Sequence, residues 1–168
     1  PKWEKLDRQT RFILPPHGPV VMAAALPPDV DVVFVDENVE PVDLGAEADF
    51  VGVSIMLTAQ VKRGWEIADA FRARGIPVIC GGIAVMLHAE ECKEHADAVF
   101  LGEAEGRMEQ VFDDFKAGRL KKVYNYMQNF PPIENVGTAR RSILNRGLYN
   151  YRGVQMVDLV HASRGCRF

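Results

Sequence analysis

Four short runs of the chain are almost continuously apolar and rich in β-branched residues. They cover residues 31–35, 50–55, 76–80 and 97–101, which read DVVFV, FVGVSI, IPVIC and DAVFL. Such runs are typical of strands buried on both faces of a sheet, because both sets of alternating side chains then meet protein. A further run at 156–162 indicates a strand near the end of the sequence. The pattern therefore predicts a sheet covered on both sides.

The segments between these runs carry the apolar spacing of amphipathic helices. The clearest covers 105–117, and its apolar positions share one face: Met108, Val111, Phe112 and Phe115. The same spacing occurs over 61–71. A short helix is expected over 19–25, because the proline at its start suits a first helical position and two prolines follow its end.

Alternating strands and helices predict an α/β fold with a parallel sheet and right-handed crossovers. The expected architecture is a flavodoxin-like (Rossmann-like), doubly wound parallel sheet, whose usual strand order is 2-1-3-4-5. That order needs a central strand before the first helix, whereas residues 1–14 are mostly charged and aperiodic. We therefore expect the first central strand to lie upstream of Pro1. The predicted organisation is an α/β domain over 1–120, a basic linker over 121–155 and the start of another domain over 156–168.

Composition narrows the range of partners. The 168 residues carry a formal net charge of −3, without the basic excess typical of proteins that bind nucleic acid or anionic membranes. No apolar run reaches the roughly 18 residues of a membrane helix, and the first residues do not resemble a signal peptide. The three cysteines have no framework spacing, which indicates free thiols in a reducing compartment. We expect a cytoplasmic protein with no membrane span and no nucleic-acid partner.

Ligands of open parallel sheets bind outside the carboxyl ends of the strands. The residues expected there combine glycines, hydroxyls, one acid and three apolar side chains: Ser54, Met56, Leu57, Thr58, Gly81, Gly82, Ile83, Gly102 and Glu103. Glycines let backbone amides approach a broad planar ligand, and the hydroxyls supply a few hydrogen bonds. Neither GxxxxGK[ST] nor GxGxxG occurs, so the pattern does not favour a phosphate loop or a dinucleotide fold.

A series of segments resembles, in order and spacing, the B12-binding domain at the front of cobalamin-dependent radical S-adenosylmethionine (SAM) enzymes. They are LPPHGPVVMAAALP, VVFVDENVE, ADFVGVSIMLTAQ, GIPVICGGIAVMLHAEE, HADAVFLGEAEG and SRGCRF, and together they span almost the whole chain. The hopanoid-processing and anaerobic magnesium-protoporphyrin cyclase branches look nearest. The resemblance implies that cobalamin binds at the strand ends. Ser54 and Thr58 would line the channel for its nucleotide tail, the Gly81–Gly82 turn would flank it, and Gly102 and Glu103 would lie beside them.

The same resemblance assigns a role to the end of the chain. Cys166 resembles the first cysteine of the CxxxCxxC loop that binds a [4Fe-4S] cluster, on which SAM is cleaved. Residues 156–168 would then begin a radical SAM barrel, the partner domain of this one. The parent protein is expected to be an enzyme of methyl transfer, cyclisation or rearrangement on a hydrophobic substrate. This chain alone is expected to bind rather than catalyse, and to take up hydroxocobalamin weakly or not at all.

Two other interpretations stay open. A family member that has lost cobalamin would be a docking module for a substrate or partner, and a free-standing flavodoxin-like domain would bind a nucleotide. The cobalt-ligating DxHxxG of methionine-synthase-like domains is absent, because residue 15 is Pro where its Asp would precede His17. We therefore expect no cobalt ligand from His17. We also expect Ser54→Leu and Gly82→Val to weaken cobalamin binding while leaving the fold intact.

Overall fold

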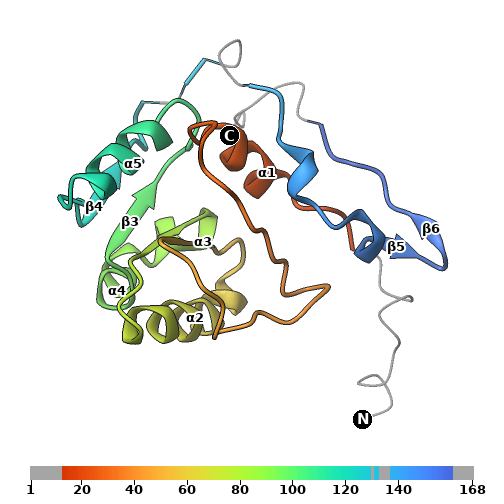
Figure 1. Cartoon of the computed structure of the whole chain (residues 1–168), viewed down its shortest axis with the longest axis horizontal. Helices are drawn as coiled ribbons and strands as arrows, with labels where there is room; N and C mark the ends of the chain where they lie inside the picture. Colours follow the sequence, from red (N-terminus) through yellow and green to blue (C-terminus); the bar gives the residue numbers. More distant parts are fainter. Residues whose placement is uncertain (1–12, 130, 133–136, 161–168) are drawn as a thin grey trace. The chain divides into compact units, whose positions relative to one another are not determined.

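The computed structural model of the chain describes residues 13–129, 131–132 and 137–160. The chain divides into two compact units (Figure 1): one spans residues 43–132, and the other combines described residues from either side of that range. The first unit carries the parallel sheet and the predicted cobalamin-binding residues. Within the described residues, every helix is too short or too polar to cross a membrane.

Four parallel strands form the sheet of the 43–132 unit: β1 (Val51–Ser54), β2 (Val78–Gly81), β3 (Ala98–Leu101) and β4 (Val123–Asn125). They pair in the order β1-β2-β3-β4, so β1 is an edge strand of the described sheet. Every residue of β3 is buried, as its unbroken apolar run predicts for a strand covered on both faces. The parallel sheet with helices between its strands confirms the predicted flavodoxin-like α/β fold.

The helices of this unit lie between or after the strands: α2 (Val61–Ala73), α3 (Ile83–Leu87), α4 (Ala89–His95) and α5 (Met108–Lys116). Val53 of β1 faces α2, since a Cβ added to Gly64 of that helix would lie 3.9 Å from the Val53 side chain. Phe50, three positions earlier, points to the other face and packs against Phe112 of α5, with ring centroids 5.5 Å apart. Helices α2 and α5 therefore cover opposite faces of the sheet.

A buried carboxylate connects the end of α5 to β4. Asp114 accepts hydrogen bonds from the Arg119 Nε (3.1 Å) and the Tyr124 hydroxyl (3.0 Å), and the Lys121 ammonium lies 3.5 Å away. The hydrogen bond from Arg119, followed by those from Tyr124 and Lys121, holds the pKa of the Asp114 carboxyl below its usual value. This network fixes the short return of the chain from the helix into the sheet.

The other unit has a small core of its own, made from both ends of the described chain: Val20, Val39, Leu144 and Tyr149. Within its described residues, this unit has one helix, two 3₁₀ turns and a two-stranded antiparallel hairpin: α1 (His17–Ala24), η5 (Arg141–Ile143), η6 (Arg146–Leu148), β5 (Asn150–Tyr151) and β6 (Val154–Gln155). The Arg140 amide donates to the Val20 carbonyl (2.9 Å). Residues after 137 thus pack against the N-terminal part of the chain.

Some predicted elements differ in the structure. Residues 31–35 form no strand, and Val33 is 87% exposed. None of the described strands pairs with this run, so its backbone groups take part in no ladder. Strand β4 lies in the stretch predicted as a linker, where three residues are too few to give a strand pattern. Residues 156–160 form no strand, and 161–162 lie outside the described residues. The strand expected upstream of Pro1 and the domain boundaries stay predictions.

Candidate functional site

The predicted cobalamin-binding residues lie together at the carboxyl edge of the sheet. Strand β1 ends at Ser54, β2 at Gly81 and β3 at Leu101, and the remaining predicted residues belong to the turns and helix starts that follow. Because the strands are parallel, these ends share one edge. The structure therefore brings the predicted residues together, and their role in binding stays a prediction.

Gly82 fixes the turn after β2 against the turn after β1. Its φ of +105° lies in the region that favours glycine. A Cβ there would overlap the Ile55 carbonyl oxygen and lie 2.9 Å from the Ile55 nitrogen. The Ile55 amide donates to the Gly81 carbonyl (2.8 Å), and the Ala84 amide donates to the Ile55 carbonyl (3.1 Å). Contrary to the expectation from the sequence, we therefore predict that Gly82→Val destabilises the fold, because any side chain there collides with backbone.

A strip of very small residues runs along the α5 face of β1 and β2 to the carboxyl edge. Since Val53 faces α2, Gly52 and Ser54 point to the other face, and Ser54 pairs in register with Gly81. Gly52 and Ser54 are exposed. A Cβ added at Gly81 would make only ordinary contacts, the nearest 3.6 Å from the Phe100 carbonyl oxygen. This small-residue lane (Gly52, Ser54, Gly81) lets a ligand lie directly on the sheet.

Two residues that shape this edge are missing from the sequence prediction. Gly52 shares the face of Ser54, and a glycine inside a strand signals close approach of a ligand or another backbone. Gln60 accepts hydrogen bonds through its Oε1 from the amides of Met56 (3.3 Å) and Leu57 (3.1 Å). No short sequence pattern signals the Gln60 contacts, since they depend on how the turn folds. Both residues help to define the surface around the lane.

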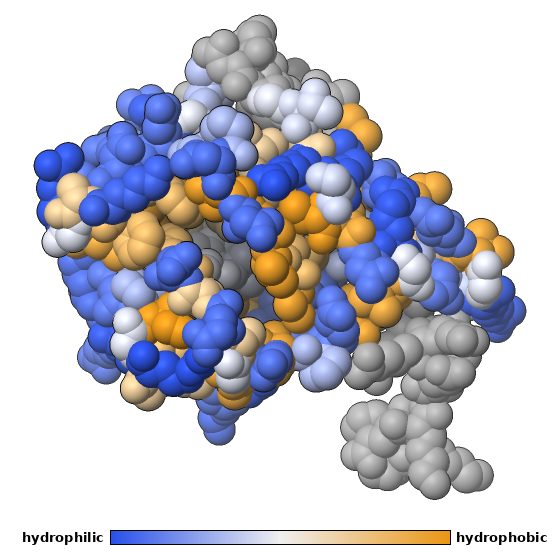
Figure 2. Space-filling model, in the orientation of Figure 1, coloured by the Kyte–Doolittle hydropathy of each residue, from blue (hydrophilic) through white to orange (hydrophobic). Residues whose placement is uncertain are grey.

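Large apolar side chains are exposed at the same edge. Met56 is 50%, Leu57 61% and Ile83 54% exposed. Leu87 lies one turn after Ile83 on α3 and is 74% exposed, and Met127, just after β4, is 42% exposed. Figure 2 shows that hydrophobic residues, in orange, lie at the surface among hydrophilic ones on one face of the molecule. Gathered apolar side chains at a surface mark a ligand or partner site. The edge therefore suits a large ligand with apolar surface.

The turn after β3 closes the far side of this edge. Gly102 has a φ of +109°, and a Cβ there would lie 2.9 Å from the carbonyl carbon of Tyr126. The Tyr126 amide donates to the Leu101 carbonyl (2.8 Å), which extends the pairing of β3 and β4 by one bond. Glu103 follows and is half-buried. The glycine thus lets the chain after β4 pack directly against the turn.

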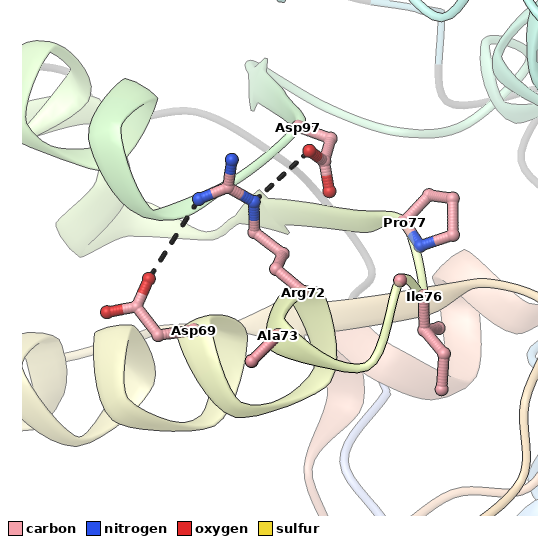
Figure 3. Close-up of a pocket in the computed structure, with 7 residues that line it drawn as sticks. Asp69, Arg72, Ala73, Ile76, Pro77 and Asp97 are labelled. Carbon is pink, nitrogen blue, oxygen red and sulfur yellow. Dashed lines mark hydrogen bonds and ion pairs between the residues drawn. The ribbon is translucent and has the colours of Figure 1, made fainter.

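A pocket of about 420 Å³ lies at the opposite, amino edge of the sheet (Figure 3), lined by the end of α2 and the residues before β2 and β3. Arg72 lies between two carboxylates there: its Nε donates to Asp97 (3.1 Å), and its Nη1 lies 4.0 Å from Asp69. Asp97 also accepts from the Val78 amide (2.8 Å). These groups hold the elements of the unit together, and we assign no ligand to this pocket.

Two polar residues of the other unit make internal contacts. Asp36 is 9% exposed and accepts hydrogen bonds from the Tyr149 hydroxyl (3.1 Å) and the Asn38 amide (2.9 Å). Burial, followed by the negative charge of Asp36, raises the pKa of Tyr149. His17 is hydrogen-bonded through its Nδ1 to the Leu159 carbonyl oxygen (3.1 Å), and its predicted absence from cobalt coordination stays a prediction. Cys166 lies outside the described residues.

Comparisons with known proteins identify the family to which the chain belongs. The family model of the B12 binding domain matches residues 6–112. The bacteriochlorophyllide d C-8(2)-methyltransferase of Chlorobaculum tepidum is 29% identical over 151 residues, 88% of this chain. The bacteriochlorophyllide d C-12(1)-methyltransferase of the same organism is 26% identical over 140 residues, 81% of this chain. The chain spans about a third of the length of these relatives, 33% and 30% respectively. No solved structure gives a significant match.

Proposed function

Because the chain belongs to the B12-binding domain family, we propose that it binds cobalamin at the carboxyl edge of its sheet, with the nucleotide tail along the small-residue lane. The lane is the observation that carries this proposal. Gly52, Ser54 and Gly81 keep bulky side chains off one strip of the sheet. Glycine and serine weaken a strand, because they offer little side chain to pack. A ligand that takes up the space explains their presence.

In this proposal, the predicted residues contact different parts of cobalamin according to their chemistry. Ser54 and Thr58 offer hydroxyls that donate to and accept from polar groups of the tail. Three glycines have no side chain that would keep the ligand away from the backbone of the turns: Gly81, Gly82 and Gly102. Glu103 lies beside them as an acceptor. The apolar residues supply surface for the ring: Met56, Leu57 and Ile83. Cobalamin supplies, when bound, a cobalt centre that can carry a methyl group, and the residues of this chain bind and orient it.

The proposal extends to a longer protein in which a radical SAM barrel follows this domain and is its partner. Residues 156–168 would begin the barrel, and Cys166 would be the first cysteine of its [4Fe-4S] loop, with SAM as a further cofactor. Similarity to two bacteriochlorophyllide methyltransferases supports methyl transfer to a large tetrapyrrole over cyclisation or rearrangement. The cytoplasmic location expected from the sequence is kept as part of the proposal.

Titration of the full-length protein with hydroxocobalamin, followed by the corrinoid absorption spectrum, tests this function. Ser54→Leu places a branched side chain in the lane, and we expect it to lower the affinity by about tenfold or more, the equivalent of ~1.4 kcal/mol. Ser142→Leu makes the same change at an exposed position of the other unit and should leave the affinity unchanged. Thermal melting of both variants checks that the fold persists.

Three results would contradict the proposal, each in a different way. A full-length wild type that leaves the corrinoid spectrum unchanged would favour a docking module that has lost cobalamin. A nucleotide that copurifies in place of a corrinoid would favour the nucleotide-binding interpretation. If cobalamin binds and Ser54→Leu binds it as tightly as the wild type, the lane is not the site of the tail.

A further inference from the structure

Arg107 carries a buried nitrogen without a hydrogen-bond partner. Its Nε has no acceptor in the described part of the chain. The residue closes the loop that follows β3 at the carboxyl edge and immediately precedes α5. A guanidinium is protonated at every physiological pH, and buried polar atoms without partners are rare enough to need an explanation. An acceptor supplied by a ligand is such an explanation.

A series of contacts leads from Arg107 to the small-residue lane. The guanidinium carbon lies 4.8 Å from the centroid of the Tyr126 ring, whose hydroxyl donates to the Gln110 Oε1 (2.8 Å). The Tyr126 and Phe100 rings have centroids 5.6 Å apart. A Cβ added to Gly81 would in turn lie 3.7 Å from the Phe100 Cβ. Arg107 is therefore held on an aromatic pair that borders the lane.

We propose that Arg107 binds the phosphodiester of the cobalamin nucleotide tail, an inference that rests on the proposed function. A guanidinium presents its N–H donors as a planar fork that matches two phosphate oxygens, and Nε belongs to that fork. The contact with the Tyr126 ring, 4.8 Å from the guanidinium carbon to the ring centroid, restricts the Arg107 side chain before the ligand arrives. The loop from Gly102 also contains Glu103 and Glu105, so Arg107 is its only cation. The phosphodiester is thus bound by one positioned side chain rather than by a generally positive surface.

Cobinamide provides the test, because it has the corrin ring and cobalt of cobalamin but lacks the nucleotide and its phosphodiester. In the full-length protein we expect Arg107→Gln to lower the affinity for hydroxocobalamin by about tenfold to a hundredfold, as for a lost charge-assisted hydrogen bond. The affinity for cobinamide should stay unchanged. Arg107→Lys keeps the charge without the fork and should give an intermediate loss. Arg152→Gln is the matched control, since Arg152 also stacks on a tyrosine (5.2 Å) but is exposed in the other unit.

The outcomes separate this inference from the proposed function. A wild type that binds neither corrinoid overturns both. If cobalamin binds and Arg107→Gln weakens both corrinoids equally, Arg107 acts on the ring or on the fold of the site, and the assignment to the phosphodiester is wrong. It is also wrong if neither affinity changes. A loss confined to a carboxylate-bearing substrate would assign Arg107 to that substrate instead. Melting curves of each variant identify any loss that comes from unfolding.

Discussion

Replacing Gly82 by alanine should destabilise the 43–132 unit far more than the same change one residue earlier. Gly82 has φ +105° and ψ 170°, a conformation almost confined to glycine. A Cβ there would lie 2.9 Å and 3.0 Å from the Ile55 nitrogen and carbonyl carbon. At Gly81 the nearest atom to an added Cβ would be 3.6 Å away, an ordinary contact. The two neighbouring glycines thus form a matched pair, one strained by a side chain and one not.

Two destabilising contributions and one stabilising contribution determine the expected change in the free energy of unfolding. The unfavourable backbone conformation costs about 1–3 kcal/mol. To relieve the overlap, the turns must separate, which weakens the hydrogen bonds from the Ile55 and Ala84 amides by about 1 kcal/mol each. Alanine also restricts the unfolded chain, which returns about 0.4–1 kcal/mol. We therefore expect Gly82→Ala to lower the free energy of unfolding by about 2–4 kcal/mol, and Gly81→Ala by less than about 1 kcal/mol.

Urea unfolding of both variants, followed by circular dichroism, measures this difference. If the free energies of unfolding for Gly82→Ala and Gly81→Ala agree within error, the turns after β1 and β2 adapt to the added side chain. The close approach of Gly82 to the Ile55 backbone would then not require a glycine. A confirmed difference has a consequence for binding studies. Loss of cobalamin in a Gly82 variant would then reflect a distorted turn, so Ser54 and Gly52 are the positions at which binding should be tested.

Three further predictions concern titratable groups. Asp114→Asn should lower the melting temperature at neutral pH, because the hydrogen bond from Arg119 holds the pKa of the Asp114 carboxyl below its usual value. A lowered carboxyl pKa stabilises the fold above the unfolded-state pKa, and this contribution is lost as the pH falls through the folded-state pKa. The gap between variant and wild type should therefore close in acid, and a gap that widens there would contradict this origin. Cys80 and Cys92 are fully buried, and their mutual hydrogen bond, followed by burial, raises the pKa of Cys80. We expect iodoacetamide to modify neither position in the folded chain and both in urea, as measured by peptide mass, and modification without urea would show that the pair is accessible. His17→Ala in the full-length protein should leave the cob(II)alamin paramagnetic resonance signal unchanged, whereas loss of a nitrogen splitting would make His17 a cobalt ligand.

The local spacing of apolar residues predicts those helices and strands whose burial involves elements close to them in the sequence. The helix expected over 105–117 is observed as Met108–Lys116, and the strand expected over 97–101 as Ala98–Leu101. The apolar spacing determines which face of the helix is buried, and the unbroken apolar run indicates that the strand is buried on both faces. The strand ends follow from these elements, which is why the predicted site residues gather at one edge. The residue at which a strand ends can thus be predicted from the sequence wherever that strand is buried on both faces.

Other features depend on partners that are distant in sequence. The run at 31–35 has the composition of a strand, but a strand also needs a neighbour to pair with, and no local pattern reports one. Arg107 is similar, because the role proposed for it depends on Tyr126, nineteen positions later, and on the contact of that ring with Phe100. The importance of Gly52 appears only when the register places Ser54 beside Gly81. Pairing and stacking of this kind become visible only in three dimensions.

The chemistry of the carboxyl edge favours a corrinoid over a nucleotide. A phosphate held by a turn needs backbone amides that point outward without partners. After β1, the amides of Met56 and Leu57 instead donate to the Gln60 Oε1, at 3.3 Å and 3.1 Å. What the edge offers is apolar surface, with Ile83 54% exposed, next to a lane in which the sheet itself is accessible. In the proposed function, such an edge would bind a large ring by contact area, and Arg107 would be the one positioned cation for the single phosphodiester of its tail.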